Sequence, residues 1–141
     1  MPGTGKTQED IVAFFDNILG RKFADAERML SSIELGLIFS KIHRPSRRRS
    51  MSKRKRQENL EYVAGYIKAL EGILIAARSG DERTFLSRMS SDPGSLEKYR
   101  RSFSAFIRNK IHSPFDRGFF SAWSDFVIHQ LNLLGEKKGG G

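Results

Sequence analysis

Apolar residues recur at helical spacing along most of the chain. The first stripe is Ile11, Phe14, Phe15, Ile18 and Leu19. This i, i+3, i+4, i+7 spacing is typical of an amphipathic helix, which we expect to begin at Thr7 as the N-cap. After Gly20 the apolar pattern resumes and continues to about Ile42, so the sequence predicts a second helix or one long kinked helix. Pro45 disfavours helical geometry at the residue before it, so we expect a break at 43–44.

The apolar pattern in the middle of the chain predicts a third helix that follows the basic residues 53–56. We expect it to end at Gly80, since glycine commonly ends helices. Its apolar stripe is Leu60, Val63, Ala64, Ile67, Leu70 and Leu74. A short helix is expected over 81–90 with Phe85, Leu86 and Met89 inward. After a turn at 91–94, Ser95 is the expected cap of a helix whose stripe is Leu96, Tyr99, Phe103, Phe106 and Ile107.

The last predicted helix is the most apolar one. Ser113 fits its N-cap, Pro114 its first position, and Asp116 gives the spacing of a capping box. Its apolar residues are Phe115, Phe119, Phe120, Trp123, Phe126, Val127, Leu131 and Leu134. Because they occupy both sides of the helical wheel, the helix is either a core element or a contact between subunits. Gly135 is expected to end it.

These patterns predict an all-α protein of five or six helices, because no segment shows strand-like alternation and no repeat of 20 to 50 residues is present. We expect a flexible N-terminal segment at 1–6, one helical domain at 7–134 and a flexible tail at 135–141. Within the domain, an extended N-terminal helical arm (7–42) precedes a basic segment (43–56) and a helical, bundle-like C-terminal portion (57–134).

Composition narrows the classes of protein that fit. With 38% hydrophobic residues in 141, we expect a small core and burial of the remaining apolar faces in self-association. The absence of Cys excludes disulfides, Cys–zinc sites and thiol nucleophiles. The N-terminus has no apolar signal core, so we expect an intracellular protein that is not secreted through a signal peptide. The apolar runs are too short to span a membrane.

The charge of the chain is concentrated in one stretch, 41–56. The 25 Lys and Arg and 16 Asp and Glu give a formal net charge of +9, and this stretch holds nine cations and no acid. Outside it, acids and bases balance. Its cations are Lys41, Arg44, Arg47, Arg48, Arg49, Lys53, Arg54, Lys55 and Arg56. A solvated loop or a nuclear-localisation-like signal is the simpler interpretation, but mutual repulsion of nine cations favours binding of a polyanion, with nucleic acid first.

The stretch contains no aromatic residue, which favours contact with the backbone of a duplex over stacking on single-stranded bases. Four cations in the opening turn of a helix also oppose its dipole, and a bound phosphate would relieve that conflict. A second basic patch lies at 98–110 and includes Arg100, Arg101 and Arg108. It is either a second nucleic-acid contact or the solvated face of an amphipathic helix.

Catalytic chemistry has little support in the sequence. His43, His112 and His129 are scattered without metal-ligand spacing, and no GxSxG elbow is present. The GTGKT segment at 3–7 lacks the earlier glycine and the preceding strand of a phosphate-binding loop. We therefore expect no enzyme, no cofactor, no metal and no small-molecule substrate.

The arrangement of a helical segment at 7–42, a basic interruption at 41–56 and a helical portion at 60–134, without Cys, resembles the major capsid proteins of filamentous and rod-shaped archaeal viruses. In that family, dimers wrap linear double-stranded DNA into a helical nucleocapsid, with A-form DNA in the filamentous members. The resemblance implies a structural protein of a virion assembled in the host cytoplasm. It also implies a DNA-backbone role for the basic stretch, and self-association or pairing with a paralogous subunit.

Two other classes remain open. One is a non-viral module, such as a chromatin-like protein or a small subunit of an RNA-guided complex, which would form discrete complexes instead of filaments. The other is a membrane-surface or protein adaptor that uses the basic stretch on anionic lipid. For the capsid hypothesis, no membrane contact is expected except with a viral envelope.

Overall fold

The computed structural model describes residues 2–42, 52–80, 93–109 and 112–140, and within these residues all regular structure is helical. This confirms the all-α prediction. The helices are α1 (Pro2–Leu19), α2 (Phe23–Ile42), α3 (Lys53–Ser79), α5 (Pro93–Arg108) and α6 (Pro114–Gly140). The short helix predicted over 81–90 and the break predicted at 43–44 lie outside the described residues.

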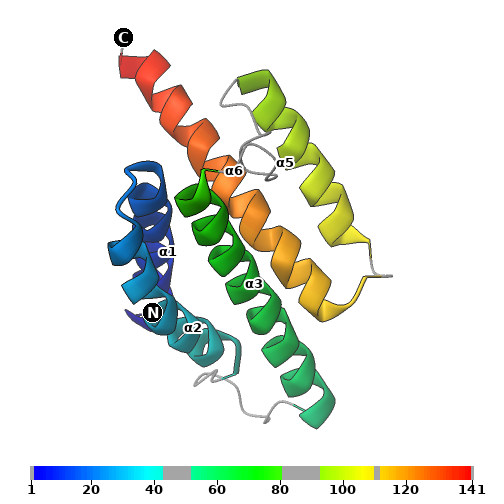
Figure 1. Cartoon of the computed structure of the whole chain (residues 1–141). Coiled ribbons are helices and arrows are strands. Elements are labelled where there is room, and N and C mark those ends of the chain that lie inside the picture. Colours follow the sequence, from blue (N-terminus) through cyan, green and yellow to red (C-terminus); the bar gives the residue numbers. More distant parts are fainter. Residues whose placement is uncertain (1, 43–51, 81–92, 110–111, 141) are drawn as a thin grey trace.

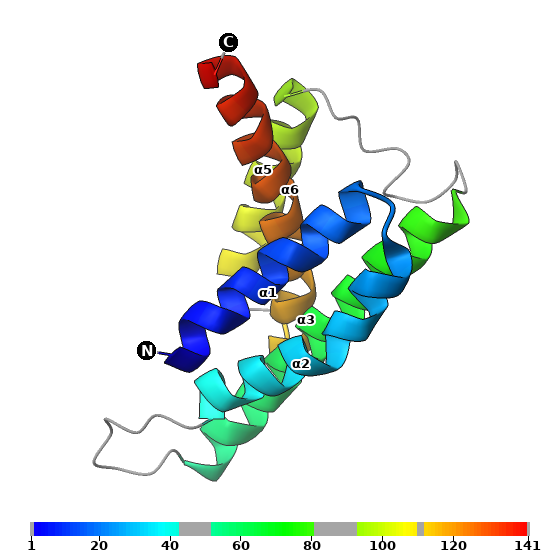
Figure 2. The ribbon, with the colours of Figure 1, turned by 90° about the vertical axis from the view of Figure 1, so that its left-hand side faces the viewer.

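Helix α6 lies between α3 and α5, and its most extensive contact is with α3 (Figure 1). Helices α1 and α2 form an antiparallel hairpin, and α2 packs along the side of α3 (Figure 2). An ion pair between Arg78 and Glu27, with 2.8 Å between Nη2 and Oε2, joins the last turn of α3 to α2. The order of packing is thus α1, α2, α3, α6, α5.

The expected extended N-terminal arm is not observed. Phe14 and Phe15 of α1 are buried, and the Phe15 ring centroid lies 5.1 Å from that of Phe126 on α6. Ile33 of α2 and Leu70 of α3 belong to the same continuous core. The prediction of an arm was wrong because burying this aromatic stripe on the chain's own bundle removes more apolar surface from water than an extended hairpin would.

The turn between α1 and α2 ends α1 close to the expected position, but not through the glycine. Lys22 N donates to Asn17 O (2.7 Å) and Arg21 N donates to Ile18 O (3.2 Å). This is the bonding pattern of a Schellman cap. The left-handed position in this cap is occupied by Arg21, whose φ is 61°, so the chain uses a residue with a Cβ where glycine would fit without strain.

The helix ends confirm some sequence signals and correct others. Gly80 adopts φ 65° and caps α3, and the Oγ of Ser113 accepts from Asp116 N at 3.1 Å, both as predicted. Helix α1, however, begins at Pro2 and not at Thr7, and α5 begins at Pro93 and not at Ser95. Proline is tolerated in a first turn because the missing N–H would have no partner there. Helix α6 continues through Gly135 to Gly140 instead of ending in a tail.

Two glycines set the crossing of α3 and α6. A Cβ added to Gly65 would collide with the backbone of Phe115, and one added to Gly118 would collide with the backbone of Tyr62. Each helix therefore presents a glycine to the main chain of the other. This reciprocal contact brings the two backbones closer than side chains would allow, which fixes where α3 begins relative to the bundle.

Candidate nucleic-acid interface

The first turn of α3 carries four consecutive cations. Ser52 caps the helix, with its Oγ accepting from Lys55 N at 3.1 Å. The four residues of the turn, 53–56, are all exposed to solvent. Arg54 has a side chain that is 92% exposed, and its Nε lies 3.5 Å from Oε1 of Glu58 one turn later. The turn is thus a solvent-facing cationic surface, as the sequence predicts.

The helix dipole makes this surface electrostatically unfavourable in isolation. The N-terminus of a helix carries partial positive charge from free N–H groups, and α3 has no acid in its first turn. Among the described residues, Lys53, Lys55 and Arg56 form no ion pair. Both the cationic side chains of residues 53–56 and the positive end of the helix dipole would attract a bound anion.

Lys41, at the end of α2, lies beside the start of α3. Its backbone oxygen accepts a hydrogen bond from Asn59 Nδ2 at 3.0 Å, and its Nζ lies 4.7 Å from the centroid of the Tyr62 ring. The fold therefore brings Lys41 together with the cations that follow it by twelve or more residues. We call Lys41 and residues 53–56 the basic end of the molecule. Sequence reasoning did not identify Asn59 or Tyr62, because nothing in their spacing signals a contact with α2.

Four predicted contact residues, Arg44, Arg47, Arg48 and Arg49, lie outside the described residues. The chain enters this stretch after Ile42 and leaves it at Ser52. Both of these points are next to the basic end.

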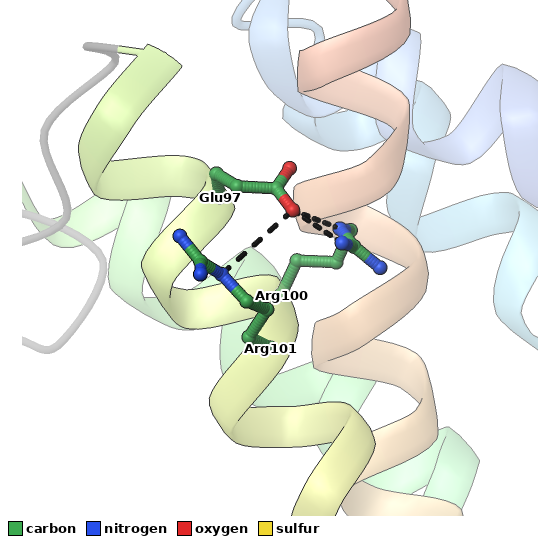
Figure 3. A network of polar contacts seen from close by, with 3 residues as sticks. All are labelled: Glu97, Arg100 and Arg101. Atoms are coloured by element: carbon green, nitrogen blue, oxygen red, sulfur yellow. Dashed lines mark hydrogen bonds and ion pairs between the residues drawn. The ribbon is translucent and has the colours of Figure 1, made fainter.

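The second basic patch occupies a different surface. On α5, Glu97 accepts a hydrogen bond from Arg100 Nε at 3.0 Å, and Arg101 Nε lies 4.0 Å from the same carboxylate oxygen (Figure 3). These contacts, first the hydrogen bond from Arg100, lower the pKa of Glu97. Within the described residues α5 packs only on α6 and does not reach α3. The structure therefore separates Arg100 and Arg101 from the basic end.

Arg108 belongs to the last turn of α5, where a cation suits the negative end of the helix dipole. Local electrostatics thus account for Arg100, Arg101 and Arg108 without a ligand. This favours the solvated-face interpretation of the second patch, whose nucleic-acid role stays a prediction.

A polar cluster between α3 and α6 was missed at the sequence level. The Tyr66 hydroxyl donates to Asp125 Oδ2 at 2.7 Å. Burial raises the pKa of Tyr66 well above its ordinary value, and the nearby Asp125 carboxylate raises it further. Asp125 is an exposed residue, yet the protein atoms around its carboxyl group displace enough water to raise its pKa, which the hydrogen bond from Tyr66 opposes. The signal that could have revealed this cluster is the acidic residue Asp125, which lies among the apolar residues of the most apolar predicted helix.

The histidines also take structural positions. His129 Nε2 lies 2.7 Å from Asp16 Oδ1 and so joins α6 to α1. The His112 ring stacks on Phe106 with 3.5 Å between centroids. His43 lies outside the described residues. The two described histidines thus contact other helices: His129, inside α6, contacts α1, and His112, just before α6, contacts α5.

Within the described ranges, no group of three or more His, Cys, Asp or Glu could hold a metal ion. None of the helices described combines the length and the apolarity needed to cross a membrane. Comparisons with models of protein families, with curated proteins and with solved structures found no match to this chain.

Proposed function

We propose that this protein binds duplex DNA through sequence-independent contacts between the basic end and backbone phosphates. The observation that carries the proposal is the exposed opening turn of α3, where Lys53, Lys55 and Arg56 stand at a helix N-terminus without acids to balance them. The arginines at 44 and 47–49 extend the same cationic segment. Contacts of this kind position a protein on DNA without selecting a sequence.

The proposed role is structural: the protein coats and packages linear double-stranded DNA. A packaging protein must bind every turn of a genome, and phosphate contacts meet that need because they are the same at every base pair. The resemblance to archaeal virus capsid proteins supports a subunit of a helical virion. Binding of this kind requires no catalytic group, no cofactor and no small-molecule substrate.

A specific observation favours a second candidate, a discrete DNA- or RNA-binding module outside a virion. Helices α1 and α2 fold back on α3 and α6, with Phe14 and Phe15 buried. A hairpin held in this way does not clasp a duplex unless it detaches from the core. A chromatin-like protein or a subunit of an RNA-guided complex would need no such change.

The binding proposal is tested by fluorescence anisotropy with two unrelated 20-base-pair duplexes over a range of salt concentrations. The variant is Lys53→Ala/Lys55→Ala/Arg56→Ala, which leaves the Arg54–Glu58 pair intact. The matched control is Arg100→Ala/Arg101→Ala/Arg108→Ala, which removes the same charge from α5. We expect the α3 variant to bind more weakly than the wild type, by the same factor for both duplexes. The slope of log K against log salt concentration should become shallower by about 0.9 for each phosphate that the variant no longer neutralises.

Equal losses of affinity in the two triple variants would show that net charge alone drives binding, which would contradict the assignment to the basic end. A loss for one duplex only would indicate base readout and contradict it too. Negative-stain microscopy with linear duplex DNA at low salt then separates the two roles. Filaments whose length follows the DNA support the coating role, and discrete particles support the module.

A further inference from the structure

Helix α6 brings a further cation, Arg117, close to the basic end. Helices α3 and α6 run in the same direction, and both begin in the lower part of the molecule in Figure 1, where α2 ends. A Cβ added to Gly118 would collide with the backbone oxygen of Tyr62, so the two main chains touch at this point. Arg117 is the residue before this glycine and therefore lies beside the part of α3 that contains Tyr62.

Helical spacing indicates which face of α6 carries Arg117. Arg117 and Ser121 are four residues apart and so share one face of the helix. This face turns toward α3, because Ser121 is buried and forms a hydrogen bond with Tyr62. Burial raises the pKa of Tyr62, while the hydrogen bond with Ser121 and the positive charge of Arg117 oppose that rise. The Arg117 guanidinium is thus close enough to the Tyr62 hydroxyl to act on its charge.

Tyr62 lies beside a cation from another helix as well. The Nζ of Lys41, at the end of α2, is 4.7 Å from the centroid of the Tyr62 ring. The cations of 53–56 begin the same helix as Tyr62. Tyr62 follows Lys55 by seven residues, which corresponds to roughly 10 Å along the helix axis. Positive charges from α2, α3 and α6 thus adjoin one another at this end of the bundle.

Local electrostatics do not account for Arg117 as they do for Arg108. Among the residues that the structure describes, no carboxylate forms an ion pair with Arg117. Arg117 stands near the positive end of the α6 dipole, which favours an acid such as Asp116 and not a cation. The residue is half-buried, so neighbouring atoms restrict its position. A phosphate bound beside it would supply a counter-charge.

We propose that Arg117 contacts a DNA phosphate, and that the DNA-binding surface extends from the basic end across Tyr62 to α6. This inference rests on the proposed function and deepens it, because a surface shared by three helices forms only when α6 packs on α3. Roughly 10 Å between the first turn of α3 and Tyr62 is too long for one phosphate to bridge, so Arg117 would neutralise a separate phosphate. The crossing of α3 and α6 holds this cation in place before DNA binds, so less side-chain entropy is lost on binding.

The first test measures the DNA affinity of Arg117→Gln by fluorescence anisotropy, with the same two 20-base-pair duplexes over a range of salt concentrations. We expect binding to be about tenfold weaker than in the wild type for both duplexes, because a charge-assisted contact with phosphate is lost. The slope of log K against log salt concentration should become shallower by about 0.9. Arg117→Lys keeps the charge and should therefore keep the wild-type slope.

The matched control is Lys22→Gln, which removes the same charge at the other end of the molecule. Lys22 is an exposed residue just before α2, whereas Lys41 is in its last turn, and a helix of 20 residues is roughly 30 Å long. We expect the affinity of this variant to stay within about twofold of the wild type, because a charge so distant from the ligand is screened. Equal losses in Arg117→Gln and Lys22→Gln would show that net charge alone matters and would overturn the inference.

A second test uses the wild-type protein and so does not depend on the folding of a variant. Phenylglyoxal modifies arginine side chains, and mass spectrometry reports the rate at each arginine with and without a 20-base-pair duplex. We expect the duplex to slow modification of Arg56 and Arg117 several-fold. Arg101, whose side chain is 73% exposed on α5, should react at an unchanged rate.

The pattern of protection separates failure of this inference from failure of the proposed function. Slower modification of Arg56 without an effect at Arg117 overturns the inference and leaves DNA binding through the basic end standing. An effect at neither residue contradicts the proposed function as well. Equal slowing of Arg56, Arg101 and Arg117 would show general shielding by the polyanion and would contradict the assignment to this surface.

Discussion

The two parts of α3 meet different demands. Residues 53–56 at its start are exposed cations, whereas the residues from Val63 to Leu74 include seven buried apolar side chains and the buried Gly65. The second part packs on α6 and α2 and makes the core. The first part contributes almost nothing to burial and is opposed by its own helix dipole. The cations of residues 53–56 lower the stability of the helix and add nothing to the core. Such an arrangement is expected where a surface binds a partner of opposite charge.

This contrast predicts that stability and DNA binding can be changed separately within one helix. Substitutions in the second part should lower the free energy of unfolding. Substitutions in the first part should leave folding intact and weaken DNA binding. Changes at Gly65, at Tyr66, at the first turn of α3 and at Asp125, the partner of Tyr66 on α6, test that separation. The measurement is the free energy of unfolding from chemical denaturation.

The largest effect is expected from Gly65→Ala. The added Cβ would collide with the Phe115 backbone, which cannot move without shifting α6, so we expect a loss of about 2–3 kcal/mol. Gly72→Ala on the same helix is the matched control, since its Cβ would meet nothing within 4 Å. There we expect a gain of about 0.5–1 kcal/mol from improved helix propensity. Similar effects at both glycines would contradict the close crossing of α3 and α6.

Tyr66→Phe removes the hydrogen bond to Asp125 and is expected to cost about 1–2 kcal/mol near pH 7. Because the folded state raises the Tyr66 pKa, the unfolded chain releases the phenol proton first, and wild-type stability falls as pH rises above about 10. The free energy of unfolding of Tyr66→Phe should therefore fall less than that of the wild type as the pH rises above about 10. An unchanged alkaline profile would show that Tyr66 is not buried as described.

Lys53→Ala/Lys55→Ala/Arg56→Ala is expected to raise the free energy of unfolding by about 0.5 kcal/mol at low salt. The reason is that the three cations stand at the positive end of α3. The gain should disappear at high salt, where such surface interactions are screened. A destabilisation of more than about 1 kcal/mol would show that the basic end supports the fold, and the contrast between the two parts of α3 would fail.

Asp125→Asn should have the smallest effect near pH 7, because asparagine can still accept the bond from Tyr66. Its signature is the dependence on pH. Protein atoms around the carboxyl group of Asp125 displace water and raise its pKa, so the folded state holds this proton more tightly. Wild-type stability therefore falls as pH rises from about 4 through the raised value. The variant should lack that fall. An identical acid profile would exclude Asp125 as a source of pH dependence.

Much of the fold followed from local signals in the sequence. The apolar stripes predicted the helices, and the signals at Gly80, Ser113 and Pro114 predicted where α3 ends and α6 begins. Other signals misled. Gly135 does not end α6, because a glycine ends a helix only where the chain turns into the left-handed region, and among the described glycines only Gly80 does so.

The candidate site was predicted in part. The sequence located the cations of 41–56, because a run of like charge is visible without a fold. It did not show that Asn59 and Tyr62 hold Lys41 beside the start of α3, since such contacts join residues 18 and more positions apart. The sequence also left open whether the cations of α5 contact nucleic acid or form a solvated helix face. The separation of Arg100 and Arg101 from α3 favours the solvated face.

The helices and the location of the charge could be predicted from local patterns, because both depend on residues close together along the chain. Folding of the whole chain was needed to show that the N-terminal helices fold back on the bundle, that Gly65 and Gly118 allow α3 and α6 to touch, and that Leu35 and Phe39 remain exposed. These outcomes depend on which apolar faces compete for burial across the whole molecule. That competition is between distant segments, so no local pattern records its result.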